Sequence, residues 1–255
     1  MALADRFLPN PLYGQGIYRR RIRMRALAGE VRADLFDDYH DMACTVHHDG
    51  TAVTAIQAEI RRAPFSTCPG ANTAANELVG IPLQVSRRHL YGEGRPQRNC
   101  THIFDLAAFA ISHAANAGGE RVLDFIVPDL VESGAWVEAC LDGKAVHRWK
   151  VGYSETIIAP AEYAGRAMFG GFVRWAEGQF EGVAVELALH LQKVVLVARG
   201  RRYLIGQENE NSIRDEPERI GACYSFSEPQ FSIARPNPDY VRDFTDGLPT
   251  RKALI

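Results

Sequence analysis

Polar and apolar residues alternate along the first quarter of the chain. The stretch YRRRIRMR (18–25) places Ile22 and Met24 between basic residues, a pattern typical of a strand with one solvated face. The same alternation, rich in β-branched residues, predicts strands at about 17–26, 30–36, 41–48 and 51–62. HHDGT (47–51) predicts a hairpin turn, because Asp-Gly accommodates the positive φ of a tight turn.

Helical patterns follow the strands. CPGANTAANELVG (68–80) predicts a helix, with Pro69 in its first turn and Gly80 at its end. A polar loop over 85–99 separates it from a second predicted helix at about 101–116. Apolar residues of this second helix lie at helical spacing: Ile103, Leu106, Ala107, Ala110 and Ile111.

The second half of the chain has a similar order of elements. It predicts a strand at 121–129, a strand–turn–strand over 135–152, and helices at 160–178 and 182–198. In each half, an Asp-Gly turn lies 22 residues before an alanine in a helix start that contains proline: Asp49 and Ala71, then Asp142 and Ala164. The spacing favours two copies of one unit, and chance similarity of two α+β halves is the alternative.

These patterns predict an α+β fold of two similar strand–hairpin–helix–helix halves packed together. We place an N-terminal arm at 1–16, the first half at 17–118 and the second half at 119–222. Residues 223–255, rich in proline and aromatic residues, are expected to pack on the body as a tail.

Composition narrows the classes of partner. The 255 residues have a net charge of −2, which gives no electrostatic reason to expect nucleic acid or an anionic membrane as a partner. No apolar run approaches the length of a membrane span or of an export signal. Five cysteines, an odd number, are expected to be free thiols in the reducing cytoplasm. Self-association into a homodimer stays open.

Residues 41–115 resemble the U-type iron–sulfur cluster scaffold proteins. The resemblance rests on the β-hairpin around DMACTVHHDG, followed by STCPGA and CTHIFDL, each with a cysteine at a helix start. It implies a similar fold for the first half, and it implies that Asp41, Cys68 and Cys100 hold a metal or cluster. The first cysteine of that family has no counterpart, and Asn99 replaces the histidine before its last cysteine.

The chain as a whole resembles a bacterial family of unknown function. NPLYGQGIYRRRIRMR, CPGANTAANELVGIPL, CTHIFDLA and GGFVRWAEG carry this likeness along nearly the full length. Members of that family are associated with the catabolism of aromatic compounds derived from lignin. The resemblance therefore implies a small aromatic molecule as substrate.

Several roles are possible for the two cysteines at predicted helix starts, Cys68 and Cys100. A helix N-terminus favours thiolate, so the pair could bind Zn²⁺ or Fe together with His102, His40 or Asp41. Buried packing, a functional thiol without metal, and a disulfide are the alternatives. No Cys-x-x-Cys and no His-Glu-x-x-His motif accompanies them.

FDDYHDM (36–42) concentrates acidic residues around a histidine. Strand alternation would place Asp38 and His40 on one face, where the carboxylate orients the imidazole as a general base. A polar surface turn is the alternative. Further along, His102 in the first turn of the second helix would serve as an acid, and Arg20 would bind a substrate phenolate. Arg19, Tyr39, Cys68 and Cys100 complete the predicted substrate site, although solvated or paired surface arginines are the simpler interpretation of 19–21.

Other chemistries lack their motifs. YGQG and YGEG have no strand–Gly-x-Gly-x-x-Gly–helix context, and neither a Walker loop nor a Gly-x-Ser-x-Gly elbow is present. The resemblance to the family associated with lignin-derived aromatics implies the substrate class, and our specific hypothesis is a carbon–carbon lyase that releases formaldehyde from a phenolic dimer. The candidate residues permit this chemistry without a redox cofactor. The rival hypothesis is a metal or cluster scaffold that is not an enzyme, and a module that binds a ligand without turnover is the third.

Overall fold

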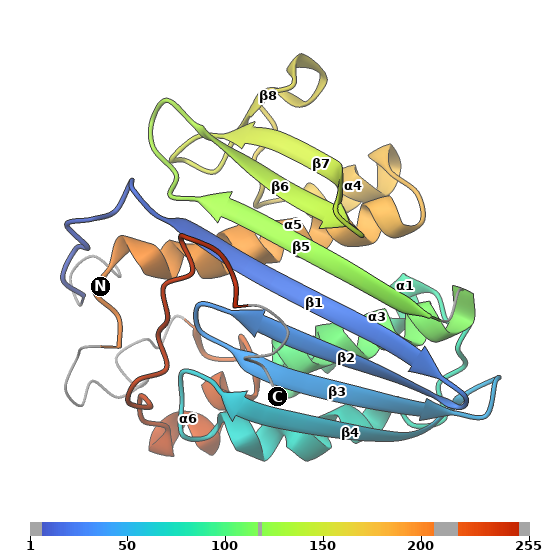
Figure 1. Ribbon diagram of the computed structural model, residues 1–255. Helices are drawn as coiled ribbons and strands as arrows, with labels where there is room; N and C mark the ends of the chain where they lie inside the picture. The colour runs from blue at the N-terminus through green and yellow to red at the C-terminus, as the bar shows by residue number, and fades with distance from the viewer. Residues whose placement is uncertain (1–6, 117–118, 207–218, 250–255) are drawn as a thin grey trace. The chain divides into compact units, whose positions relative to one another are not determined.

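The computed structural model describes residues 7–116, 119–206 and 219–249. It confirms the α+β class, with eight antiparallel strands and several helices among these residues (Figure 1). The chain forms two compact units. Unit 1 comprises Met1–Arg21, Val122–Ile205 and Asp243–Ile255, and unit 2 comprises Ile22–Arg121 and Gly206–Arg242.

Four strands of unit 2 are hydrogen bonded in the order β4-β3-β2-β1. Burial alternates along β2, where Val31, Ala33 and Leu35 are fully buried between partly exposed residues. This alternation is the reason that the sequence pattern located the strands within a residue or two: β1 (Ile17–Leu27), β2 (Glu30–Asp37), β3 (Asp41–His48) and β4 (Val53–Arg62). The largest difference is at the start of β4, which begins at Val53, two residues after the predicted start and beyond the hairpin turn. Strand β1 also contributes to unit 1, because the division falls between Arg21 and Ile22.

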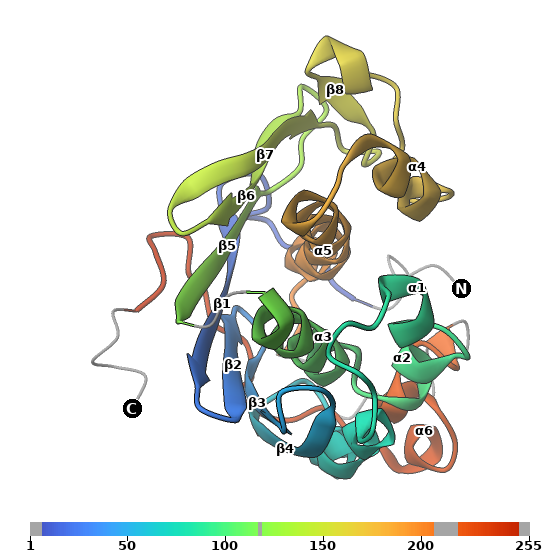
Figure 2. The same cartoon turned by 90° about the vertical axis from the view of Figure 1, so that its right-hand side faces the viewer.

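One face of this sheet is covered by α3 (Thr101–Asn116), which packs against β2 and β3 (Figure 2). Its bounds agree with the prediction, since its apolar residues repeat at helical spacing and are buried. The predicted helix at 68–80 is present as the 3₁₀ helix η2 (Cys68–Leu78). The polar loop between them contains two short helices, α1 (Arg87–Leu90) and α2 (Arg95–Arg98).

The C-terminal part of unit 2 contains η7 (Tyr224–Phe226) and α6 (Gln230–Ile233). The chain after α6 runs along the end of β4. Phe65 and Pro236 form an isolated β-bridge, and the backbone N–H of Asn237 donates to the carbonyl of Pro64. Residues 223–242 of the predicted tail are therefore part of unit 2, while residues from 243 onward belong to unit 1.

In unit 1, strand β1 is followed in the sheet by β5 (Glu120–Pro128), β6 (Ala135–Leu141), β7 (Lys144–Val151) and β8 (Ile157–Ala159). Helix α5 (Val183–Ala198) packs on β6 and β7, and it confirms the helix predicted at 182–198 (Figure 2). A ring cluster around the buried Trp149 fills the space beside it: His147, Tyr163, Phe172, Trp175 and Phe180.

The single helix predicted at 160–178 is wrong. The structure has the short η3 (Ala161–Tyr163), then a turn, then α4 (Phe172–Gln179). Three glycines between these elements, Gly165, Gly170 and Gly171, have positive φ of 84°, 76° and 76°, a backbone conformation that ends a right-handed helix. The proposed repeat of two halves stays a prediction.

No helix among the described residues is both long enough and apolar enough to cross a membrane.

The contact between α3 and the sheet of unit 2 should dominate the stability of that unit. Leu106 on α3 is fully buried, so Leu106→Ala should lower the free energy of unfolding by about 2–5 kcal/mol. Val79, whose side chain is 45% exposed, provides the control, and Val79→Ala should change stability by only about 0.5 kcal/mol. Urea denaturation of the full chain measures both values. Equal losses in the two variants would contradict the packing described here.

Candidate functional site

The turn between β2 and β3 is organised by one buried carboxylate. Strand β2 ends at Asp37 and β3 begins at Asp41. The Oδ1 atom of Asp37 accepts the backbone N–H of Tyr39 at 2.8 Å and that of His40 at 2.7 Å. The side chain of Asp37 is fully buried, so these donors replace the water that an ionised carboxylate would otherwise need.

The same carboxylate orients the imidazole of His40. The Nδ1 atom lies 3.0 Å from Oδ1 and 3.2 Å from Oδ2 of Asp37. Because Asp37 already accepts two backbone donors, it is the acceptor here as well, and Nδ1 carries the proton. The basic lone pair of His40 is then on Nε2. This is the arrangement of a carboxylate-supported general base.

The expected pairing of His40 with Asp38 is corrected by this geometry. The expectation assumed continuous strand alternation through residues 36–42, whereas the chain leaves the strand conformation between Asp37 and Asp41. In the turn, the residue that lies against the His40 ring is Asp37, three positions earlier. Asp38 is buried beside it and contributes its backbone carbonyl to the contacts that follow.

His102 joins His40 at the site. It lies in the first turn of α3, and its ring centroid is 3.9 Å from that of His40, with an angle of 33° between the ring planes. His40 is 5% exposed, while His102 is half-buried. The structure thus brings together the two histidines that the sequence analysis assigned as base and acid.

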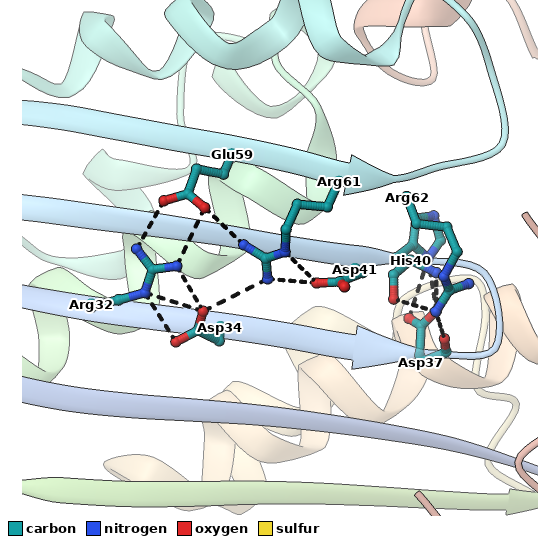
Figure 3. A network of polar contacts seen from close by, with 8 residues as sticks. All are labelled: Arg32, Asp34, Asp37, His40, Asp41, Glu59, Arg61 and Arg62. Atoms are coloured by element: carbon teal, nitrogen blue, oxygen red, sulfur yellow. Dashed lines mark hydrogen bonds and ion pairs between the residues drawn. The ribbon is translucent and has the colours of Figure 1, made fainter. Parts of the chain in front are cut away.

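An arginine that the sequence analysis did not select holds the turn in place. The Nη1 atom of Arg62 donates to the carbonyl oxygens of Asp38 at 2.9 Å and Tyr240 at 2.6 Å. Its Nη2 atom donates to the carbonyl oxygens of Asp37 at 2.6 Å and His40 at 3.0 Å. Figure 3 shows this guanidinium against the Asp37–His40 pair. The Arg62 side chain therefore ties the turn to the C-terminal part of the chain.

Partial burial shapes the chemistry of Arg62. Its guanidinium lies 5.3 Å from the ring centroid of Phe36, and loss of solvent lowers its pKa from the usual value. The neighbouring Asp37 partly offsets that effect. The sequence offered little indication of this role for Arg62, because Arg61 and Arg62 together form the basic end of a predicted strand. Alternation along β4 leaves Arg61 exposed and turns Arg62 inward.

Aromatic side chains border the histidines. The ring of Tyr39 packs edge-on to His40 with centroids 6.3 Å apart, and it lies at the same distance from the ring of Tyr240. The backbone N–H of Arg242 donates to the carbonyl of Asp38 at 2.7 Å. Tyr240 is distant in sequence from the other residues, so its place here could not be read from local patterns.

The predicted metal ligand Asp41 has a different partner. Its carboxylate accepts from Nε of Arg61 at 2.8 Å, within a ladder of ion pairs that includes Arg32, Asp34 and Glu59 (Figure 3). These pairs are partly exposed, and pairs of this kind contribute little to stability. Among the described residues, no group of three or more His, Cys, Asp or Glu side chains is arranged to hold a metal ion.

Cys68 and Cys100 are buried, with 9% and 8% exposure. Burial raises the pKa of both thiols above the usual value, so the expected lowering at a helix start is wrong. Loss of solvent outweighs the few backbone N–H groups that favour thiolate. The hydroxyl of Ser225 lies 3.4 Å from the Cys68 sulfur and donates to it. All five cysteines of the chain are free thiols.

The two arginines predicted to bind substrate belong to unit 1. Arg20 is 1% exposed, donates to the hydroxyl of Tyr18 at 3.0 Å, and lies 3.3 Å from Nε2 of His190. Arg19 donates through Nε to the carbonyl of Phe244 at 3.0 Å. The Asp37–His40–His102 group lies in unit 2. A role for Arg19 or Arg20 in holding a phenolate stays a prediction.

One known family matches part of the chain. Residues 20–115 match a family described as a protein of unknown function, DUF2889. The matched region contains Asp37, His40, Arg62 and His102, whereas Tyr240 lies outside it. Among curated proteins, none matches the chain significantly.

Arg62 provides a direct test of how the turn is held. Arg62→Met should lower the free energy of unfolding by at least about 1–3 kcal/mol, because it leaves turn carbonyls without their charged donor. Arg61→Met is the matched control, since Arg61 forms only partly exposed ion pairs and its loss should cost less than about 1 kcal/mol. Chemical denaturation of both variants gives the comparison. An Arg61→Met loss as large as that of Arg62→Met would show that the turn does not depend on Arg62.

Proposed function

We propose that the protein is a carbon–carbon lyase acting on phenolic aromatic dimers derived from lignin. The reaction removes a side-chain hydroxymethyl group as formaldehyde, passes through a quinone methide and yields a stilbene. The observation that carries the proposal is the Asp37–His40 pair stacked on His102, an acid–base arrangement that needs no redox cofactor. The substrate class rests on the resemblance to a family associated with the catabolism of lignin-derived aromatics.

The reaction begins with the phenolate of the substrate. Its electrons pass through the ring to the benzylic carbon and expel the aryl ether oxygen there, which forms a quinone methide. His102 is assigned as the acid that gives a proton to the departing aryl oxygen. Its half-buried position at the start of α3 leaves it accessible for this role.

His40 is assigned as the base. Its Nε2 atom takes the proton of the side-chain alcohol, and the carbon–carbon bond to the hydroxymethyl carbon breaks. That carbon leaves as formaldehyde, while the bond electrons form the stilbene double bond and restore the aromatic phenolate. The carboxylate of Asp37 stabilises the imidazolium that results, because it accepts from Nδ1.

The surroundings of the histidines suit an aromatic substrate. The ring of Tyr39 lies edge-on to the imidazole of His40 and tilted by 53° against the ring of Tyr240, and an aromatic cluster of this kind favours a planar aromatic guest. The buried position of His40 also limits water near Nε2, which strengthens electrostatic interactions with a developing alkoxide.

Formaldehyde release from a phenolic dimer with a side-chain hydroxymethyl group tests the proposal. The wild-type chain should release formaldehyde and form stilbene in equal amounts. His40→Gln should lower the rate by about 10²–10⁴-fold, because the base is lost. His47→Gln is the matched control, since His47 lies in the β3–β4 hairpin beside Glu30, and its rate should be unchanged.

Asp37→Asn extends this test to the support of the base. The amide keeps an oxygen that can accept the backbone N–H groups of Tyr39 and His40, so the turn should be retained. The negative charge opposite Nδ1 is lost, and the rate should fall while the chain stays folded. If the wild-type chain consumes no phenolic dimer, or if His40→Gln and His47→Gln release formaldehyde equally, the assignment is wrong.

Metal analysis of the purified chain addresses the alternative of a metal or iron–sulfur scaffold. Stoichiometric Fe or Zn that disappears in both Cys68→Ala and Cys100→Ala would replace the lyase proposal with a scaffold or a metalloenzyme. We expect no stoichiometric metal, because nowhere among the described residues do three or more His, Cys, Asp or Glu side chains lie close enough together to bind one ion.

A further inference from the structure

Three cysteines of unit 2 come from segments that are far apart in the sequence. Cys68 begins η2, Cys100 directly precedes α3, and Cys223 directly precedes η7. The backbone N–H of Tyr224 donates to the carbonyl of Asn99 at 2.9 Å, which joins the neighbours of Cys223 and Cys100.

The contacts of η7 with the start of η2 are closer still. The hydroxyl of Ser225 lies 3.4 Å from the sulfur of Cys68, and the hydroxyl of Thr67 donates to Ser225 at 3.0 Å. The Tyr224 hydroxyl packs on Gly70, where an added Cβ would lie only 2.7 Å from it. The segment that carries Cys223 is thus seated against the segment that carries Cys68.

Burial is the largest cause that raises the pKa of Cys100 and of Cys68. Negative charge on Cys68 or Cys223 adds to the rise for Cys100, and negative charge on Cys223 adds to it for Cys68. The other two cysteines of the chain lie on β3 and β6, as Cys44 and Cys140. Nothing in the acid–base assignment above uses the three thiols.

We propose that Cys68, Cys100 and Cys223 form an oxidation site, in which a peroxide oxidant links Cys223 to Cys68 by a disulfide. The bond would join η7 to η2 and fasten residues 219–242 to the body of unit 2. Cys68 is the assigned partner because Ser225, two residues from Cys223, contacts its sulfur directly.

Cys223 is the entry point. It is the only one of these three thiols that is half-buried rather than buried. Burial raises its pKa, but the positive charge of Arg219 and the backbone N–H groups of Phe226 and Ser225 act in the opposite direction. Cys223 is therefore the most accessible of the three thiols to peroxide, and Arg219 with the two N–H groups offsets part of the burial that disfavours thiolate, the reactive form.

The chemistry balances with hydrogen peroxide as the two-electron oxidant. The Cys223 thiolate attacks one peroxide oxygen and the O–O bond breaks, which gives a sulfenic acid and hydroxide. The Cys68 sulfur then attacks the sulfenic sulfur and displaces its hydroxyl group. The protons of the two thiols end on the two departing oxygens, so both oxygens of the peroxide leave as water.

The experiment treats the full chain with hydrogen peroxide, blocks remaining thiols and identifies linked tryptic peptides by mass spectrometry. Arginines separate the three cysteines in sequence, so trypsin places each in its own peptide. The expected product is a Cys68–Cys223 peptide pair from a single chain. Cys68→Ser and Cys223→Ser should each abolish it, and Cys140 should form no intramolecular link.

The rate supplies a second readout. Because burial raises the pKa of these thiols, they are protonated at neutral pH. Formation of the disulfide should therefore accelerate about tenfold for each unit of pH increase below the pKa of Cys223. Arg219→Met should slow the reaction without changing the product. If the linked peptides contain Cys100 and Cys223, the assigned partner is wrong. If Cys68 and Cys223 are still free thiols when peroxide has already oxidised Cys140, the proposal itself is wrong.

Discussion

A buried hydrogen-bonded turn is the constraint on which the site depends. The carboxylate of Asp37 accepts two backbone N–H groups and the Nδ1 proton of His40, and the guanidinium of Arg62 donates to the carbonyl oxygens of the same turn. The Asp37 carboxylate thus accepts backbone N–H groups, and the Arg62 guanidinium donates to backbone carbonyl groups. These hydrogen bonds replace those that water would make to each ion, so they offset most of the desolvation cost that would otherwise oppose folding.

This constraint has consequences in two directions. Toward the sheet, it joins the ends of β2, β3 and β4 and holds the imidazole of His40 in the turn, where it stacks on His102 of α3. Toward the C-terminus, the bond from Arg62 to the carbonyl of Tyr240 recruits a segment that the sequence separates from the site by 178 residues. His40, Tyr39 and Tyr240 are thus held by the same set of contacts, and His102 stacks on His40.

Much of the fold could be predicted from local patterns, because burial alternates along β1 and β2 and the apolar residues of α3 repeat at helical spacing. The sequence also indicated His40 and His102 as partners, because it assigned them as base and acid. It did not identify Asp37 as the carboxylate that supports His40. The choice between Asp37 and Asp38 depends on the residue at which β2 ends, because side chains in the turn no longer alternate as they do in a strand. The position of the Arg62 guanidinium could not be predicted either, because it donates to carbonyl groups that are distant from Arg62 in the sequence. The helix predicted at 160–178 failed because glycines with positive φ interrupt it.

The central claim is that Asp37 fixes the proton of His40 on Nδ1 and leaves the basic lone pair on Nε2. Long-range ¹⁵N–¹H correlation spectra of the full chain with labelled histidine report the tautomer directly, and His40→Gln identifies the signals. The account predicts that neutral His40 has a protonated Nδ1 and an unprotonated Nε2. A neutral His40 with its proton on Nε2 would contradict the account, because that ring could neither donate to Asp37 nor act as the proposed base.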